Sequence, residues 1–151
     1  MGKCIRYNSI ITAKEIVNEA QSRNLSIVVS QNVRCTPLYR KLAYLIKEEV
    51  YGKASFGLMI KLGWRPKVHH SGKVHHSYLW ERGVHDLDTI LSLFNSQPKR
   101  IWGYSFNPFW SPYEHGAGTY TWVEFEDGIT LISSNIWKRR NICIVFFLSI
   151  N

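Results

Sequence analysis

The sequence predicts an α+β domain in which a mostly antiparallel open sheet carries its helices on one face. Segments with helical apolar spacing alternate with single strands over the first two thirds of the 151 residues, and only strands follow. Asp127-Gly128 separates two of the late strands, and this pair is typical of a type I′ hairpin between antiparallel neighbours. With 45% apolar residues, the chain is long enough to bury a core.

The first half of the chain contains two predicted helices with a short strand between them. The capping box TAKE is expected to begin the first helix, which ends near Asn24. Residues 25–30 (LSIVVS) then form a short buried strand. Thr36-Pro37 begins the second helix with proline at its first position, and Gly52 is expected to cap its end.

The second half begins with a strand at residues 54–62, where apolar residues alternate with others. The buried face of this strand is predicted to consist of Ala54, Phe56, Leu58, Ile60 and Leu62. A loop rich in histidine, lysine and glycine follows over residues 63–77. Beyond the next helix, strands are predicted at residues 101–106, 120–126 and 129–132.

The helix in WERGVHDLDTILSLF (residues 80–94) combines an apolar face with a face that carries reactive groups. Its predicted apolar face consists of Val84, Leu87, Leu91 and Phe94. The opposite face carries Glu81, His85, Asp88 and Thr89. An imidazole with a carboxylate one turn away can exchange protons near neutral pH. From spacing alone, however, an ordinary solvated helix face is the commoner explanation.

Three stretches occur in order along the chain: QNVRCTP (residues 31–37), EEVYGK (48–53) and ERGVHDLD (81–88). Together with the Asp-Gly hairpin they resemble, over residues 11–132, the second domain of the Gfo/Idh/MocA oxidoreductases, the relatives of glucose–fructose oxidoreductase and inositol dehydrogenase. Members of this family join an N-terminal Rossmann domain, which binds NAD or NADP, to a C-terminal α+β domain. The latter contributes the substrate wall and, through its open sheet, the oligomer interface.

The resemblance implies a division of the chain into three parts. Residues 1–24 correspond to the end of the nucleotide-binding domain, and residues 25–137 to the C-terminal α+β domain. No G-x-G-x-x-G motif follows an N-terminal strand, so we expect the rest of the dinucleotide domain to be absent. Residues 138–151 do not read like the strands that normally complete the sheet, and we expect an atypical, truncated or frame-shifted tail.

The resemblance also implies a catalytic role for His85, which matches the family histidine that exchanges a proton with the substrate hydroxyl during hydride transfer. Glu81 stands where the family commonly has an aspartate, and its charge would favour the protonated imidazole. Asp88 matches a frequent family acid and would orient His85 from its other side.

Further residues are implied at the substrate and the cofactor. Asn32 and Arg34 match strand-end residues beside the substrate pocket. Trp64 and Arg65 belong to a loop whose family equivalent often lies near that pocket. The nearest counterpart of the family's Glu-Lys-Pro lysine, which sits by the nicotinamide, is Lys3, although neither Glu nor Pro flanks it.

Composition argues against several other classes of protein. Nineteen basic and eleven acidic residues give a net charge of +8, but the basic residues are scattered, which favours a solvated surface over a nucleic-acid site. Cys4, Cys35 and Cys143 are odd in number and far apart, which favours a reducing compartment over a disulfide framework. No apolar run is long enough to span a bilayer. We therefore expect a cytoplasmic protein with no membrane partner.

Two further features can be interpreted either as ordinary structure or as a binding site. HHSGKVHH (residues 69–76) places four histidines within eight residues, but no cysteine or carboxylate completes a familiar pattern, so we expect a surface loop and no metal site. Aromatic residues could form a platform for nucleic-acid bases, but their alternation favours sheet core and a homo-oligomer interface. They are Trp102, Tyr104, Phe106, Phe109, Trp110, Tyr120 and Trp122.

The sequence thus predicts the substrate-binding and oligomerisation portion of an NAD(P)-dependent oxidoreductase. It would act on a CH–OH group of a sugar or polyol, with NAD or NADP as the cofactor of the complete enzyme. The alternative is a non-catalytic remnant that self-associates or binds a ligand without a cofactor. A basic nucleic-acid-binding domain is the least favoured interpretation.

Overall fold

The computed structural model describes residues 10–64, 75–138 and 143–150. The chain divides into two compact units, residues 1–30 and residues 31–151, and each is a separate body of structure. Of the helices within the described ranges, none is both long enough and apolar enough to cross a lipid bilayer.

The first unit contains the helix α1 (Ile10–Ser22). Its end is as predicted, because Asn24 takes the left-handed conformation (φ 52°) that asparagine tolerates. The predicted start is wrong, since Thr12 already lies inside the helix and is not its N-cap. The strand predicted at residues 25–30 is also wrong, because these residues are exposed and form no strand. An apolar run becomes a strand only where a neighbouring strand satisfies its backbone.

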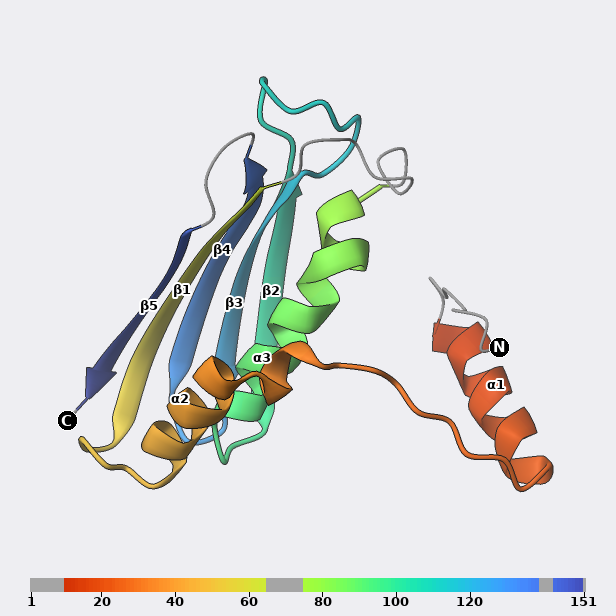
Figure 1. Cartoon of the computed structure of the whole chain (residues 1–151), viewed down its shortest axis with the longest axis horizontal. Helices are drawn as coiled ribbons and strands as arrows, with labels where there is room; N and C mark the ends of the chain where they lie inside the picture. Colours follow the sequence, from red (N-terminus) through yellow and green to blue (C-terminus); the bar gives the residue numbers. More distant parts are fainter. Residues whose placement is uncertain (1–9, 65–74, 139–142, 151) are drawn as a thin grey trace. The chain divides into compact units, whose positions relative to one another are not determined.

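The second unit is built on a five-stranded sheet (Figure 1). Its strands are β1 (Ala54–Trp64), β2 (Pro98–Phe106), β3 (Gly118–Phe125), β4 (Thr130–Lys138) and β5 (Cys143–Ile150). They lie in the order β2-β3-β4-β1-β5; β1 and β4 are parallel, and the other neighbouring pairs are antiparallel. The predicted mostly antiparallel open sheet is therefore confirmed.

Helical segments of this unit lie on one face of the sheet, as Figure 1 shows for α2 and α3. They are the 3₁₀ turn η1 (Val33–Cys35), α2 (Pro37–Lys47), the π-helical turn η3 (Leu79–Gly83) and α3 (Val84–Leu93). None of the helices in the described part of this unit lies on the opposite face of the sheet.

The ends of α2 follow the sequence signals only in part. The helix begins as predicted, with Thr36 extended at the N-cap and Pro37 at the first helical position. It ends earlier than predicted, because Glu48 is the C-cap residue and Glu49 takes a positive φ (48°). Gly52, with φ 112°, lies in the following turn that leads into β1.

The hairpin between β3 and β4 is present, but its turn type differs from the prediction. Gly128 N–H donates to the Phe125 carbonyl (3.1 Å), and Phe125 N–H donates to the Ile129 carbonyl (2.9 Å). Gly128 has a positive φ (89°), whereas Asp127 does not, and a type I′ turn requires both. The loop is instead longer than two residues and ends in a left-handed glycine, a common alternative in hairpins.

The hydrophobic core lies between the helices and the sheet. Its fully buried members include Met59, Ile90, Leu93, Val123, Phe125 and Leu131. Phe94 packs edge-on against Phe125, with ring centroids 4.9 Å apart. Burial of each such side chain stabilises the fold by about 1.5–3 kcal/mol, so these contacts hold α3 against the centre of the sheet.

The buried faces of β1 and α3 differ from those predicted, although Ala54 is buried as expected. In β1, Met59 and Lys61 point toward the helices, and the alternate apolar residues from Phe56 to Leu62 lie partly exposed on the open face. In α3 the buried residues are Asp86, Thr89, Ile90 and Leu93. Phe94 is buried as predicted, whereas Leu91 is exposed. The buried side of both elements contains charged residues, which the polar–apolar pattern assigned to solvent.

The open face of the sheet carries apolar residues on all five strands, and the aromatic residues predicted for this face in β2 and β3 lie on it. The strand register aligns one row of residues, Trp102, Trp122, Ile132, Leu58 and Phe147. The next row consists of Tyr104, Tyr120, Ser134, Ile60 and Val145. Phe109 and Trp110 lie outside this face, in the loop after β2. A contiguous exposed apolar surface of this kind is typical of an interaction surface.

Residues 143–150, expected to belong to an atypical tail, form the regular strand β5 at the edge of the sheet. Phe146 and Leu148 pack against the core, while Val145 and Phe147 face the open side. This alternation explains why the segment pairs with β1 over its length.

Candidate functional site

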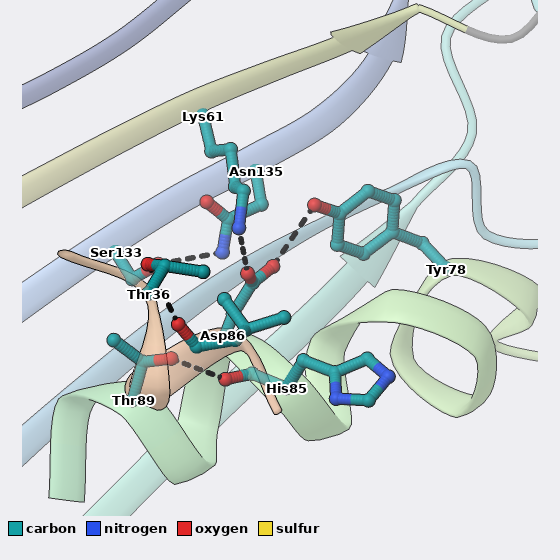
Figure 2. Close-up of polar contacts among 9 residues, drawn as sticks. Thr36, Lys61, Tyr78, His85, Asp86, Thr89, Ser133 and Asn135 are labelled. Carbon is teal, nitrogen blue, oxygen red and sulfur yellow. Dashed lines mark hydrogen bonds and ion pairs between the residues drawn. The ribbon is translucent and has the colours of Figure 1, made fainter. Parts of the chain in front are cut away.

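The candidate site lies on the side of α3 that faces away from the sheet. The turn η3 contains Glu81 and continues directly into α3, whose second residue is His85. Figure 2 shows the His85 imidazole pointing away from the buried pair formed by Lys61 and Asp86. A π-helical turn holds one extra residue and often occurs at functional sites.

A second element, η1, contributes Arg34 to this side of α3. The Arg34 Nη1 atom lies 3.3 Å from Asp88 Oδ1, and half of the arginine side chain is exposed. Asp88 Oδ2 is buried and has no hydrogen-bond partner among the described residues. The ion pair therefore brings together two residues that the sequence assigned to the substrate side, 54 positions apart.

His85 is half-buried, and its Nδ1 atom is buried without a hydrogen-bond partner among the described residues. The backbone of His85 is held in place, because Thr89 Oγ1 donates to its carbonyl oxygen at 2.7 Å (Figure 2). Leaving a buried polar atom unpaired costs about 1–3 kcal/mol, and such atoms in a native fold call for an explanation. An imidazole nitrogen in this state is suited to a hydrogen bond with a ligand.

The remaining predicted site residues are distributed as follows. Asn32 is exposed at the start of η1, where its carbonyl accepts the Cys35 N–H (3.0 Å). Trp64 is the last residue of β1. Lys3 and Arg65 lie outside the described residues. The pairing of Glu81 with His85 stays a prediction.

The histidine-rich loop is described only at its end. The rings of His75 and His115 stack with centroids 4.2 Å apart, and His76 follows with a positive φ (57°). His69 and His70 lie outside the described residues. Among the residues that are described, no group of three metal-ligating side chains converges.

Sequence reasoning missed a buried polar cluster beneath α3, which we call the ion-pair cluster: Lys61, Asp86 and Tyr78. Lys61 Nζ lies 2.5 Å from Asp86 Oδ1, and the two side chains are 5% and 2% exposed. Tyr78 Oη donates to Asp86 Oδ2 at 3.0 Å (Figure 2). Burial raises the pKa of the Tyr78 hydroxyl, and the charge of Asp86 raises that pKa further, so Tyr78 remains a donor. The only sequence signal was a lysine within an otherwise apolar strand.

The described residues do not fit a nicotinamide dinucleotide. The glycines with the closest spacing to a phosphate-binding turn, Gly116 and Gly118, lead into a strand and not into a helix. A Cβ atom at Gly118 would lie 2.5 Å from the Phe106 ring, so this glycine accommodates an aromatic side chain. Among the described residues, therefore, no glycine-rich turn leads into a helix N-terminus of the kind that binds a dinucleotide pyrophosphate.

Comparison with known proteins identifies similar folds but no similar sequences. The sequence matches no family model and no curated protein. Among solved structures, a probable dehydrogenase from Thermotoga maritima has a TM-score of 0.80 at 10% identity, covering 95% of this chain and 44% of that protein. An NAD-binding protein from Listeria innocua has a TM-score of 0.77 at 20% identity, covering 91% and 41%.

A third structure, UDP-N-acetylglucosamine 3-dehydrogenase from Acidithiobacillus ferrooxidans, has a TM-score of 0.64 at 16% identity, covering 90% of this chain and 40% of that protein. The chain therefore spans less than half the length of each of these proteins. At such low identities the likeness concerns the fold. This chain therefore has the α+β fold of part of these proteins, which are described as dehydrogenases or as an NAD-binding protein.

Proposed function

We propose that this chain is the substrate-binding and oligomerisation portion of an NAD(P)-dependent oxidoreductase that acts on a CH–OH group of a sugar or polyol. The observation that carries the proposal is His85, whose Nδ1 atom is buried and unpaired among the described residues, on a fold found in dehydrogenases. One structural neighbour is a dehydrogenase of a nucleotide sugar, which supports the substrate class.

Oxidation of an alcohol requires a base for the hydroxyl proton and an acceptor for the hydride. In our proposal His85 takes the proton, since imidazole titrates near neutral pH. Glu81, in the turn before α3, favours the imidazolium that forms. The hydride acceptor, NAD or NADP, is bound by a nucleotide-binding domain that the described residues do not include.

The substrate wall in this proposal is formed around Arg34. Its exposed half can donate to substrate oxygens while the guanidinium remains paired with Asp88, because arginine offers five donors in a fixed plane. Asn32, exposed at the start of the same turn, adds an amide that can donate and accept. Such a set recognises neighbouring hydroxyl groups, which supports a sugar or polyol substrate.

Oligomerisation is proposed to use the open face of the sheet. Trp102 at one side and Phe147 at the other are each 59% exposed, and the row between them is apolar. A second copy of the chain would remove this surface from water. We also propose a cytoplasmic location, because an odd and dispersed set of cysteines suits a reducing compartment.

The second candidate is a non-catalytic chain that self-associates through the same face. The apolar open face favours it, because self-association requires neither His85 nor a cofactor. The two candidates differ in whether His85 contributes to ligand binding.

Calorimetric titration of the chain with NADH, NADPH, myo-inositol, glucose and UDP-N-acetylglucosamine tests the proposal. We expect binding of a sugar or polyol that weakens at least about tenfold, or 1.4 kcal/mol, in His85→Ala. The matched control is His75→Ala, which removes an exposed imidazole that stacks on His115 and lies outside the proposed substrate wall.

Each outcome of this titration has a distinct meaning. Binding that is lost in His85→Ala and kept in His75→Ala supports the substrate-binding role. Tight binding of either dinucleotide by the chain alone would contradict the domain assignment. No heat with any ligand would favour the non-catalytic, self-associating candidate.

A further inference from the structure

The helix that carries His85 is attached at two points, one in the loop that precedes β3 and one in β1. At its start, Ser77 N–H donates to the His115 carbonyl (3.3 Å) and Tyr78 N–H to the Gly116 carbonyl (2.9 Å). In its middle, Asp86 is paired with Lys61 of β1. The turn η3 (Leu79–Gly83) lies between these two attachments.

The π-helical form of η3 is visible in its hydrogen bonding, because Val84 N–H reaches back five residues to the Leu79 carbonyl. A regular α-helix would connect this N–H to Trp80, four residues back. Gly83 suits the wider turn, since a Cβ atom there would lie 3.0 Å from Leu79 Cδ1. A residue with a side chain would crowd this contact.

The extra residue explains how Tyr78 can reach Asp86. In a regular α-helix, eight residues rotate the chain by about 800°, which leaves the two side chains about 80° apart around the helix axis. One residue accommodated by a π turn removes most of that difference. Tyr78 Oη then meets Asp86 Oδ2 at 3.0 Å, on the same side as Lys61.

We propose that the ion-pair cluster of Lys61, Asp86 and Tyr78 is a positioning element that holds η3 in its π-helical form and so sets the orientation of Glu81 relative to His85. Conversion of η3 to a regular helix would rotate the residues before it by about 100° relative to those after it. Glu81 lies inside η3 and His85 lies after it, so their relative orientation depends on this turn. The proposal deepens the proposed function and rests on it for the role of these two residues.

The chemistry of the cluster supports a positioning role over a purely stabilising one. A buried ion pair is often no more stable than apolar residues of the same volume, because both charges lose their hydration. The advantage of the pair is that its hydrogen bonds have defined directions. One carboxylate oxygen of Asp86 accepts from Lys61 of β1, and the other accepts from Tyr78 at the start of the helix. An apolar contact would not select one rotation of the helix.

The test compares two tyrosine variants in the full chain by NMR. Tyr78→Phe removes the hydrogen bond to Asp86 and keeps the ring. The matched control is Tyr39→Phe, because Tyr39 is also buried, lies beside the same lysine, and has a hydroxyl without a partner among the described residues. One readout is the scalar coupling across the hydrogen bond from Val84 N–H, which identifies the carbonyl that accepts it. The other is the ¹⁵N shift of the His85 imidazole.

In the wild-type chain and in Tyr39→Phe we expect Val84 to couple with Leu79. In Tyr78→Phe we expect this coupling to be lost, coupling with Trp80 to appear, and the His85 ring signals to shift. Should Tyr78→Phe not fold, the double variant Lys61→Met/Asp86→Leu replaces the ion pair by apolar side chains and is measured in its place. Retention of the Leu79 coupling and of the His85 signals in the folded variant would overturn the proposal, whatever its stability.

These measurements use no substrate and no cofactor, so they are separate from the titration that tests the proposed function. A shifted His85 signal in Tyr78→Phe together with silence toward every sugar would remove the enzymatic role and leave the positioning effect. Ligand binding that depends on His85, with an unchanged turn in Tyr78→Phe, would do the reverse.

Discussion

Replacing Lys61 by methionine is expected to lower the free energy of unfolding of the second unit by about 3–5 kcal/mol. Methionine fills most of the space of the lysine side chain, so the cost of a cavity is small. The cost arises because Asp86, only 2% exposed, would lose the ammonium 2.5 Å away and retain one described partner, the Tyr78 hydroxyl. A buried charge left without its counter-charge is strongly destabilising.

The double variant Lys61→Met/Asp86→Leu separates the charge from the packing. It removes both ions, so the desolvation cost disappears, and the remaining penalty is the Tyr78 hydroxyl that loses its acceptor, about 1–3 kcal/mol. We therefore expect the double variant to regain about 2 kcal/mol relative to Lys61→Met alone. Asp86→Leu alone leaves a buried ammonium, and we expect it to be as unstable as Lys61→Met.

Urea unfolding followed by circular dichroism measures these differences. With a slope of about 2 kcal/mol per molar urea, the loss in Lys61→Met corresponds to a shift of the midpoint by about 2 M. A loss below about 1 kcal/mol in Lys61→Met would refute the argument, because the pair would then not be excluded from water. A double variant no more stable than the single one would refute it as well, since the loss would then come from packing.

Two further predictions concern the surface of the sheet. Trp102→Glu is expected to reduce the oligomer size measured by sedimentation. The control is Ile101→Glu, because Ile101 is equally exposed (59%) but lies on the other face of the same strand, and we expect it to leave the oligomer size unchanged. Equal behaviour of the two variants would exclude the open face as the interface. The hydrogen bond from Arg100, assisted by the charges of Arg100 and Lys99, lowers the pKa of Glu124. The ionised Glu124 carboxylate therefore stabilises the fold above the ordinary glutamate pKa, and this stabilisation is lost as the pH falls through the lowered pKa. In urea unfolding we expect Glu124→Gln to be less stable than wild type at pH 6 and equally stable at pH 2. The control is Glu126→Gln in the exposed turn, which we expect to match wild type at both pH values. A difference between Glu124→Gln and wild type that persists at pH 2 would assign the effect to packing.

Local signals in the sequence predicted much of the fold correctly. Thr36-Pro37 begins α2, Asn24 ends α1, and the Asp-Gly pair lies in the hairpin between β3 and β4. These features depend on neighbours in the chain, because capping and turn formation involve residues a few positions apart. The apolar alternation of the late strands likewise predicted the open face, since strand periodicity is a local property.

The sequence named the residues of the candidate site, but it did not predict how they are arranged in space. His85 and Asp88 share one helix, so their proximity follows from helical spacing. The contact of Arg34 with Asp88 depends on η1 packing beside α3, which no local pattern indicates. The same holds for the unpaired Nδ1 atom of His85, because burial is a property of the folded chain.

By itself, the sequence determined the sheet class, the order of helices and strands from α2 to β4, and the position of a histidine and carboxylates on one helix. Tertiary structure alone decided which faces of β1 and α3 are buried. Lys61 and Asp86 are 25 residues apart in the chain and form an ion pair inside the core. Each charge alone would be unstable when buried, but the opposite charge beside it makes burial of both possible. A polar–apolar pattern evaluates each residue against solvent, whereas burial depends on the partner that the fold brings to it.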